Sequence, residues 1–223
     1  MKIYCLPVFL ILFFATETLH AQTIYVRPAP GYGARHRKPP AKRYRSEKQN
    51  IPKFEPSVNL SFGYGFPNVD KEEFVHFSGL HMGNAMQTGP ITGAINYRFS
   101  RNMGIGVMVT HGKVNVPYYD YYTGTKTLNG TLDNWAFMFD IVRYVPISNS
   151  RITPYIRTAI GVNSWKQDYT DVNGSKINYI STPSDFAYQA GIGANISLTK
   201  NAGLFLEAGY GKYILHGGLS FKF

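Results

Sequence analysis

The sequence predicts an all-β protein, an eight-stranded antiparallel up-and-down β-barrel that spans a membrane. Three observations lead to this class. From residue 56 onward, runs of about ten residues alternate apolar side chains with small or polar ones, which is the two-residue period of a strand. Glycine (22 residues) and tyrosine (17) are abundant and charged residues make up only 16%, a balance that favours many short strands over helices. The connections between runs alternate in length, as they do in transmembrane barrels.

The N-terminal residues are typical of an export signal. Lys2 supplies the positive start, residues 6–15 form the apolar stretch, and residues 19–21 form a cleavage motif. A membrane-spanning helix is the rival interpretation, but it needs about 20 apolar residues and Thr16 ends this stretch too early. We therefore predict a signal peptide at residues 1–21.

A basic, proline-rich tail follows at residues 22–55. Between residues 23 and 55 it holds nine Lys or Arg residues against two Glu, whereas residues 56–223 hold thirteen against ten acidic residues. The prolines keep such a segment extended. Two roles stay open for it, a flexible linker and an arm that binds anionic envelope polymers or lipid head groups. Nucleic acid is not an expected partner, because an exported chain seldom meets it.

Eight alternating runs make up residues 56–223, the predicted barrel. The sixth run, residues 186–198, keeps the period over thirteen residues without an error. The apolar positions of the other seven are, in order, Val58, Leu60, Phe62, Tyr64 and Phe66; Ile91, Ile95, Tyr97 and Phe99; Ile105, Val107 and Val109; Trp135, Phe137, Phe139 and Ile141; Ile156, Ile160 and Val162; Leu204, Leu206, Ala208 and Tyr210; and Leu215, Leu219, Phe221 and Phe223.

The connections predict two different rims. The short ones are residues 100–102, 146–151 and 199–202, and the long ones are 67–88, 115–130 and 166–184. Asn129-Gly130 and Asn173-Gly174 lie in two of the long loops as turn-forming pairs. Transmembrane barrels place tight turns in the periplasm and long loops outside the cell. We therefore expect the N-terminal tail and the C-terminus in the periplasm.

The polar face of the runs indicates which side meets lipid. It consists mainly of Gly, Ser, Asn, Thr and Ala, which suit a narrow packed lumen, whereas a soluble ligand-carrying barrel needs solvated chains such as Lys and Glu outside. Five strand charges also lie on this polar parity: Arg98, Asp140, Arg157, Glu207 and Lys222. An Arg or Lys on the lipid face near the midplane costs about 2–4 kcal/mol.

Buried charges need partners, so we expect these five residues to form a salt-bridge network inside the lumen. A β-hairpin centred between residues 148 and 149 sets Asp140 opposite Arg157, and Glu207 faces Lys222 across the last strand pair. The alternative is a narrow channel that conducts ions along the same charges.

Aromatic residues gather at both predicted rims, as in the girdles of membrane barrels. Those near the long loops are Tyr64, Phe66, Trp135, Trp165 and Tyr210, and those near the short turns are Phe99, Phe221 and Phe223. Ordinary sheet packing explains any one of them equally well.

The ending Leu219, Phe221, Phe223 resembles the insertion signature that the outer-membrane assembly machinery reads. With the export signal and the eight runs, residues 56–223 resemble the small outer-membrane β-barrel family, often labelled porin-like and similar in plan to the OmpA transmembrane domain. The resemblance implies an outer-membrane location, contact with membrane lipids and lipopolysaccharide, and an inward charged cluster that seals the lumen. The cluster corresponds here to Asp140, Arg157, Glu207 and Lys222. The extra segment precedes the barrel, so peptidoglycan anchoring is not expected unless the tail supplies it.

The sequence predicts no catalytic, cofactor or metal site. His76 and His81 share a loop with acidic residues without fixing a coordination geometry, and no Ser/His/acid spacing accompanies His111 near a rim. The single cysteine, Cys5, lies in the signal segment, which leaves the mature chain without thiol chemistry. We expect a structural or surface-interaction role, with a narrow channel as the alternative and an outer-membrane enzyme as a weaker one.

A cluster of tyrosines in the second long loop offers the best candidates for contact with an extracellular glycan or protein: Tyr118, Tyr119, Tyr121 and Tyr122. Tyrosine provides a large amphipathic surface at a low cost in side-chain entropy. The alternative is a girdle extension that stands in the lipopolysaccharide layer.

Overall fold

The computed structural model describes residues 54–147, 151–177 and 183–223. The predicted signal peptide and the basic tail up to residue 53 lie outside these ranges. In the part of the chain that is described, no helix is long and apolar enough to cross a membrane.

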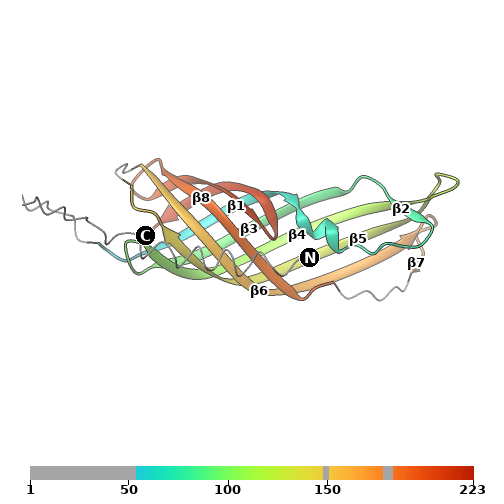
Figure 1. Ribbon diagram of the computed structural model, residues 1–223, viewed down its shortest axis with the longest axis horizontal. Helices are drawn as coiled ribbons and strands as arrows, with labels where there is room; N and C mark the ends of the chain where they lie inside the picture. The colour runs from blue at the N-terminus through green and yellow to red at the C-terminus, as the bar shows by residue number, and fades with distance from the viewer. Residues whose placement is uncertain (1–53, 148–150, 178–182) are drawn as a thin grey trace, which may run out of the picture. The chain divides into compact units, whose positions relative to one another are not determined.

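Eight long strands form the body of residues 54–223 (Figure 1). They are β1 (Ser57–Asn68), β3 (Met86–Arg98), β4 (Met103–Asp120), β5 (Lys126–Tyr144), β6 (Ile152–Asp171), β8 (Phe186–Ser197), β9 (Ala202–Tyr210) and β10 (Tyr213–Lys222). Three short elements accompany them: the 3-10 helix η2 (Val69–Glu73), β2 (Leu80–Met82), which pairs with β4, and β7 (Lys176–Ile177), which pairs with β6. All eight predicted runs fall on the eight long strands.

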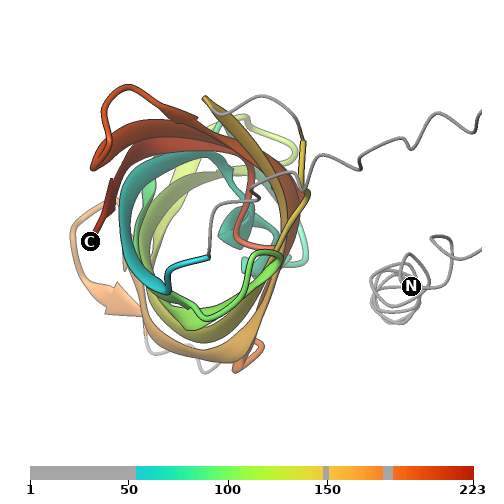
Figure 2. The ribbon, with the colours of Figure 1, turned by 90° about the vertical axis from the view of Figure 1, so that its left-hand side faces the viewer.

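The sheet closes on itself because its first strand pairs with its last. Phe62 of β1 lies opposite Gly93 of β3 on one side and opposite Leu219 of β10 on the other. The amides of Val58 and Phe223 donate to each other's carbonyl oxygens at 3.0 and 2.9 Å. Figure 2 shows the strands as a ring. Every long strand is antiparallel to both neighbours, which confirms the predicted eight-stranded up-and-down barrel.

The outward face of the barrel strands is apolar. Phe62, Ile95, Phe139 and Leu219 each have an exposed fraction between 49% and 57%. The inward positions instead bury polar side chains, among them Thr92, Asn96, Asp140, Arg157, Gln189 and Glu207. Because a water-soluble barrel is apolar inside and polar outside, the predicted lipid-facing orientation of the apolar side chains is confirmed.

Three strands are much longer than a membrane requires. β4, β5 and β6 have 18, 19 and 20 residues, whereas about 9–11 residues of a tilted strand span the bilayer. These strands continue beyond one rim of the barrel, which we call the extended rim. We call the opposite rim, where β1 begins and β10 ends, the terminal rim. Most of the predicted loop 115–130 is therefore strand, and so are residues 166–171 and 176–177 of the predicted loop 166–184.

The outward face of these strands changes from apolar to charged side chains at one row of the sheet. His111 lies opposite Trp135, and Trp135 opposite Ser164. Towards the terminal rim, the next outward row on β4, β5 and β6 is Val109, Phe137 and Val162; towards the strand tips it is Lys113, Asp133 and Lys166. Charged side chains on the outside belong in water, so the row of Trp135 marks the edge of the lipid-facing band.

Beyond that row, the inward face changes from mainly polar to apolar side chains. Val114, Val116, Tyr118, Leu128, Leu132 and Tyr169 are buried there and form an apolar core with Phe74. We call this part the extended lobe; it comprises β4 from Lys113, β5 to Asp133, β6 from Ser164, and residues 69–85 packed against them. It has the pattern of a small water-soluble domain, polar outside and apolar inside.

The turns differ from the prediction at Asn129-Gly130 and at the β9–β10 connection. Asn129-Gly130 is not a turn, because it lies within β5, paired with β4 and β6. Asn173-Gly174 does lie in a turn, where Gly174 has a φ of +81° that favours glycine. The β9–β10 connection is only the pair Gly211-Lys212, although it lies at the extended rim with the long connections.

Candidate functional site: the lumen network and the extended lobe

Arg157 is the centre of an ionic network across the lumen. Its Nε lies 3.3 Å from Oδ2 of Asp140, and its Nη1 lies 3.1 Å from Oε2 of Glu207. The side chains of both acidic residues are 0% exposed, and that of Arg157 is 6% exposed. One cation therefore joins two carboxylates that come from β5 and β9.

Neutral donors complete the network around the carboxylates. Nδ2 of Asn96 donates to Asp140 at 2.8 Å. The hydroxyls of Tyr155 and Tyr213 donate to Glu207 at 3.0 and 2.9 Å. Charge-assisted hydrogen bonds of this kind offset the desolvation of buried carboxylates. We call these side chains, which come from β3, β5, β6, β9 and β10 and meet inside the lumen, the Arg157 layer.

The predicted pairing of these charges is wrong in register. Asp140 lies opposite Ala159, and Glu207 lies opposite His216 rather than Lys222. Arg157 reaches Asp140 diagonally, which its length allows because diagonal neighbours in a sheet are about 7–8 Å apart. The centre of the predicted hairpin, residues 148–149, lies outside the described residues.

The other two predicted members lie near the terminal rim. Lys222 is exposed, and its backbone amide donates to the carbonyl oxygen of Asn201. The Arg98 guanidinium lies 4.1 Å from the ring centroid of Tyr144, and its Nε donates to the carbonyl oxygen of Ser100. The predicted network of five charges is thus a network of three, with two separate cations at one rim.

A second buried ion pair lies near the extended rim. Nζ of Lys212 lies 2.8 Å from Oδ1 of Asp70, and their side chains are 6% and 8% exposed. Asn134 donates to the other oxygen of Asp70 at 2.9 Å, and Asp70 itself lies in η2. Figure 2 shows η2 inside the ring of strands. This pair went unpredicted because its members are 142 residues apart and neither belongs to an alternating run.

The four predicted tyrosines do not act together. Tyr118 is 0% exposed, and its hydroxyl donates to the carbonyl oxygen of Val75 at 2.8 Å. Burial, together with the neighbouring Tyr169, raises the pKa of Tyr118. Its inward parity places it in the core of the extended lobe, so it is not available for surface contact. The rings of Phe77 and Tyr118 meet edge to face at 5.2 Å.

The other three tyrosines lie at the end of the lobe. Tyr121 and Tyr122 are 73% and 92% exposed. The ring of Tyr119 stacks on His81 with 5.6 Å between centroids, and Tyr121 meets the same imidazole edge to face. We call His81, Tyr119, Tyr121 and Tyr122 the tip cluster.

Asp120 organises the turn that carries this cluster. Its Oδ1 accepts hydrogen bonds from the backbone amides of Tyr122 and Thr123 at 2.9 and 2.8 Å and from the Thr123 hydroxyl at 3.0 Å. The hydrogen bond from the Thr123 amide is the main reason why the pKa of Asp120 lies below its usual range. An aspartate at this position is a common way to start such a turn.

The predicted girdle residues divide between the surface and the core. Tyr64, Phe66 and Tyr210 are about half exposed, and Trp135 stacks on His111 with 4.3 Å between ring centroids. Trp165 is different: it points inward, packs against the lobe core and donates from Nε1 to the carbonyl oxygen of Ser184. Odd-numbered residues of β6 point inward, so the sequence pattern already placed Trp165 inside, and its prediction as a girdle residue is wrong.

At the terminal rim, Phe99 and Phe223 are 44% and 69% exposed. The predicted insertion signature alternates along β10, with Leu219 opposite Phe62 and Phe221 opposite Leu60. It therefore lies on the outward face of the strand pair that closes the barrel.

The histidines named in the sequence lie apart from one another. His76 is exposed, His81 belongs to the tip cluster, and His111 lies 3.5 Å from Asp133 at the edge of the lipid-facing band. Within residues 54–147, 151–177 and 183–223, no group of three or more His, Cys, Asp or Glu side chains could hold a metal ion.

Comparisons with known proteins agree with this geometry. The profile of the family described as "Outer membrane protein beta-barrel domain" matches residues 48–222. No curated protein matches the chain.

Solved structures with a similar fold include Ail of Yersinia pestis, which is 13% identical with a TM-score of 0.39, and covers 75% of this chain and 97% of that one. That Ail structure contains the heparin analogue sucrose octasulfate. The N-terminal barrel of OprF from Pseudomonas aeruginosa is 14% identical (TM-score 0.35; coverage 75% and 97%), and OprG from the same organism is 11% identical (TM-score 0.39; coverage 75% and 95%).

Proposed function

This chain belongs to the outer membrane protein β-barrel domain family, and from this premise we propose that it is a closed barrel that displays a folded lobe at the cell surface. As a small outer-membrane barrel it is surrounded by membrane lipid. The proposed role is interaction at the surface rather than transport or catalysis.

The main support for this proposal is the exchange of apolar and polar faces at the row of Trp135. Beyond that row the strands keep their pairing but reverse their apolar and polar faces, so the lobe has its own core in water. A flexible loop has to be ordered when it binds, whereas a lobe that is already packed presents its surface without that entropic cost. A barrel that serves only as an anchor needs no such lobe.

We place the extended lobe outside the cell and the terminal rim in the periplasm, with lipopolysaccharide around the extended rim. The mature chain contains no cysteine if cleavage follows residue 21, so single cysteines can report this orientation. Asn173→Cys lies in the β6–β7 turn of the lobe, and Asn102→Cys lies in the β3–β4 turn at the terminal rim. A membrane-impermeant maleimide should label Asn173→Cys on intact cells and Asn102→Cys only after the outer membrane is permeabilised. The reverse pattern would contradict the orientation.

The tip cluster is the proposed contact surface, and a glycan is the partner that its chemistry favours. Exposed aromatic rings offer flat apolar faces with hydroxyl groups at their edges. The test is binding of the mature protein in lipid nanodiscs to an array of immobilised glycans. We expect the double variant Tyr121→Ser, Tyr122→Ser to lose the bound glycans, while Val172→Ser, an exposed apolar residue in the neighbouring turn, retains them. Equal binding by both variants would assign the contact to another surface.

A narrow channel is the rival function, and two closed layers count against it. The Arg157 layer links side chains of β5, β6 and β9, and the pair of Asp70 and Lys212 links η2 to the β9–β10 turn nearer the extended rim. In planar bilayers we expect the wild-type protein to give no conductance above that of the bare membrane. Stepwise conductance would overturn the closed lumen.

We propose no catalytic activity. His111 is the histidine at the edge of the lipid-facing band, and its ring is held by stacking on Trp135. Expression of the wild-type protein should leave the lipid A of the host cell unchanged, and so should expression of His111→Ala. Lipid A modified by the wild type and not by the variant would show an enzyme.

The outward alternation of Leu219, Phe221 and Phe223 is the proposed contact for the assembly machinery. Phe223→Ser should slow barrel insertion more than Phe99→Ser does, although both residues are exposed at the terminal rim. The rate is measured as the appearance of the heat-modifiable form on unboiled gels.

A further inference from the structure

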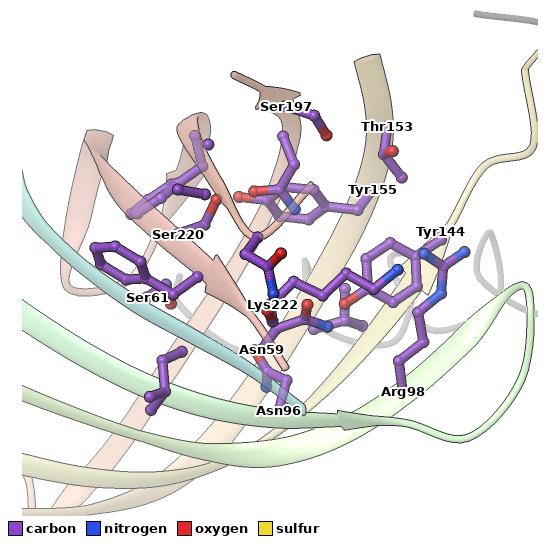
Figure 3. A pocket seen from close by; sticks show the side chains of 18 of the residues that line it. Asn59, Ser61, Asn96, Arg98, Tyr144, Thr153, Tyr155, Ser197, Ser220 and Lys222 are labelled. Carbon is purple, nitrogen blue, oxygen red and sulfur yellow. Dashed lines mark hydrogen bonds between the residues drawn. The ribbon is translucent and has the colours of Figure 1, made fainter. Parts of the chain in front are cut away.

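The lumen contains a polar pocket between the Arg157 layer and the terminal rim. Its volume is about 200 Å³, and every long strand except β4 contributes to its wall (Figure 3). Arg157 and Tyr155 lie at its inner end, while Lys200 and Lys222 lie at its mouth. We call this space the vestibule.

The charged side chains that line the vestibule are all cationic. They are Arg98, Arg157, Lys200 and Lys222, and no Asp or Glu among the described residues belongs to the lining. Asp140 and Glu207 lie behind Arg157 and, when both are ionised, leave that triad with one net negative charge. Together with the three other cations, Arg98, Lys200 and Lys222, the vestibule and the triad behind it carry about two net positive charges. A narrow cleft of one sign focuses its field and raises the local concentration of oppositely charged solutes.

One of these cations is held in place. The Arg98 guanidinium lies between two aromatic rings, 4.1 Å from the centroid of Tyr144 and 5.7 Å from that of Phe54. Stacking and the hydrogen bonds from Nε to the carbonyl oxygen of Ser100 and from Nη2 to that of Arg101 limit its rotation. A positioned guanidinium has five N–H groups, so those not used in these two hydrogen bonds can bind a carboxylate.

Neutral hydrogen-bonding side chains also line the wall, beside apolar ones such as Leu60 and Val142. Hydroxyl groups come from Ser61, Thr153, Ser197 and Ser220, and amide groups from Asn59, Asn96 and Asn195. Figure 3 shows these side chains, except Asn195, as labelled sticks around the pocket. A bare inorganic anion needs few such partners, whereas a solute that carries several hydroxyl groups can use many of them. The volume lies below the roughly 300–1,000 Å³ of pockets for drug-sized ligands, so it suits a small solute.

We propose that the vestibule binds a small organic acid with several hydroxyl groups, of the sugar-acid class, through Arg98 and Lys222. The carboxylate lies between these two cations, and the hydroxyl groups of the solute exchange hydrogen bonds with the Ser and Asn side chains of the wall. This site is separate from the proposed surface role, because it lies at the opposite end of the barrel from the tip cluster.

The test is titration of the full mature chain in phosphocholine micelles with glucuronate, followed by backbone amide NMR. Glucose serves as the uncharged probe and inorganic phosphate as the bare anion. Two single variants, Arg98→Gln and Lys222→Gln, remove the proposed cations. Lys113→Gln removes the same charge from the outward face of the extended lobe. Unboiled gels establish that each variant is folded before it is titrated.

We expect glucuronate to shift the amide signals of Ser61, Asn195 and Ser220 and to bind more tightly than phosphate. Each cation variant should weaken its binding about tenfold, as expected for the loss of one charge-assisted hydrogen bond, and Lys113→Gln should not. Glucose should cause no saturable shift. The proposal is overturned if glucuronate leaves these signals unchanged, if phosphate binds as tightly, or if both folded cation variants bind like the wild type. Loss of glycan binding at the tip cluster has no bearing on these outcomes.

Discussion

Replacing Arg157 with methionine should destabilise the barrel more than any other single charge removal in the lumen. Methionine retains much of the length of the side chain but leaves Asp140 and Glu207 without the cation that lies 3.3 and 3.1 Å from them. Both carboxylates remain fully buried, and Arg157 is the one cation that contacts them among the described residues. The tyrosine and asparagine donors stay in place and offset part of the loss.

Two free energies set the size of the expected loss of stability: the cost of breaking a buried ion pair and the cost of protonating a carboxylate. Breaking a buried ion pair by removing one partner typically costs about 3–5 kcal/mol. A carboxyl group left alone can become neutral by binding a proton, which costs about 4 kcal/mol at pH 7, since that pH lies about three units above the ordinary pKa of Asp or Glu. The free energy of unfolding of Arg157→Met should therefore fall by about 3–5 kcal/mol at pH 7. The loss should be smaller at pH 5, where protonation costs less.

The assay is equilibrium unfolding in urea from phospholipid vesicles, followed by tryptophan fluorescence and by the unboiled-gel shift. Arg143→Met, on the outward parity of β5 near the terminal rim, is the matched control and should cost no more than about 1 kcal/mol. The triple variant Asp140→Asn, Arg157→Met, Glu207→Gln removes every charge and should recover most of the stability. If Arg157→Met unfolds within about 1 kcal/mol of the wild type, the lumen is hydrated enough to screen these charges and the closed-layer reasoning fails.

Three further predictions address the sheet, the lipid boundary and the tip. Gly161→Ala sets a methyl group against the backbone of β5 and should lower the free energy of unfolding by about 1–3 kcal/mol, whereas Gly93→Ala, with ordinary contacts, should change it little; equal effects in urea unfolding would contradict the close approach. Phe139→Arg in the lipid-facing band should cost about 2–4 kcal/mol, while Thr131→Arg on the outward face of the same strand in the lobe should cost only about 1 kcal/mol, for its hydrogen bond to Asn115; a similar cost for both would misplace the boundary. The depressed pKa of Asp120 means that its contribution to the turn is complete above its unfolded pKa and is lost as the pH falls through its folded pKa; a carboxyl ¹³C titration with a midpoint at or above about 3.9 would contradict this.

The barrel itself could be predicted because its cause is local. In runs such as residues 135–141 and 186–198, every second side chain faces lipid, and a strand in lipid requires an apolar residue at each of those positions. The period therefore appears in the sequence without knowledge of any partner strand. The outward exposure of Phe139 and Ile192 follows from the same rule.

The extended lobe was missed although its signal is present. The two-residue period continues from Val107 and Val109 into Val114, Val116 and Tyr118, but the apolar residues change from odd to even positions. A search for one parity interprets that change as the end of the strand. It marks instead the passage from lipid to water, where the inner face becomes the apolar one. The same change places Tyr118 in a core and not at the surface.

The local pattern of the sequence therefore predicted the fold class, the lipid-facing residues and the inward parity of Asp140, Arg157 and Glu207, but not the buried pair of Asp70 and Lys212. Which lumen charges meet depends on the closed barrel. Arg157 joins Asp140 and Glu207, and Lys212 joins Asp70 from 142 residues away. The reason is that partners across a barrel depend on the tilt and stagger of all eight strands at closure. That stagger is a property of the closed ring, and no single strand or hairpin contains it.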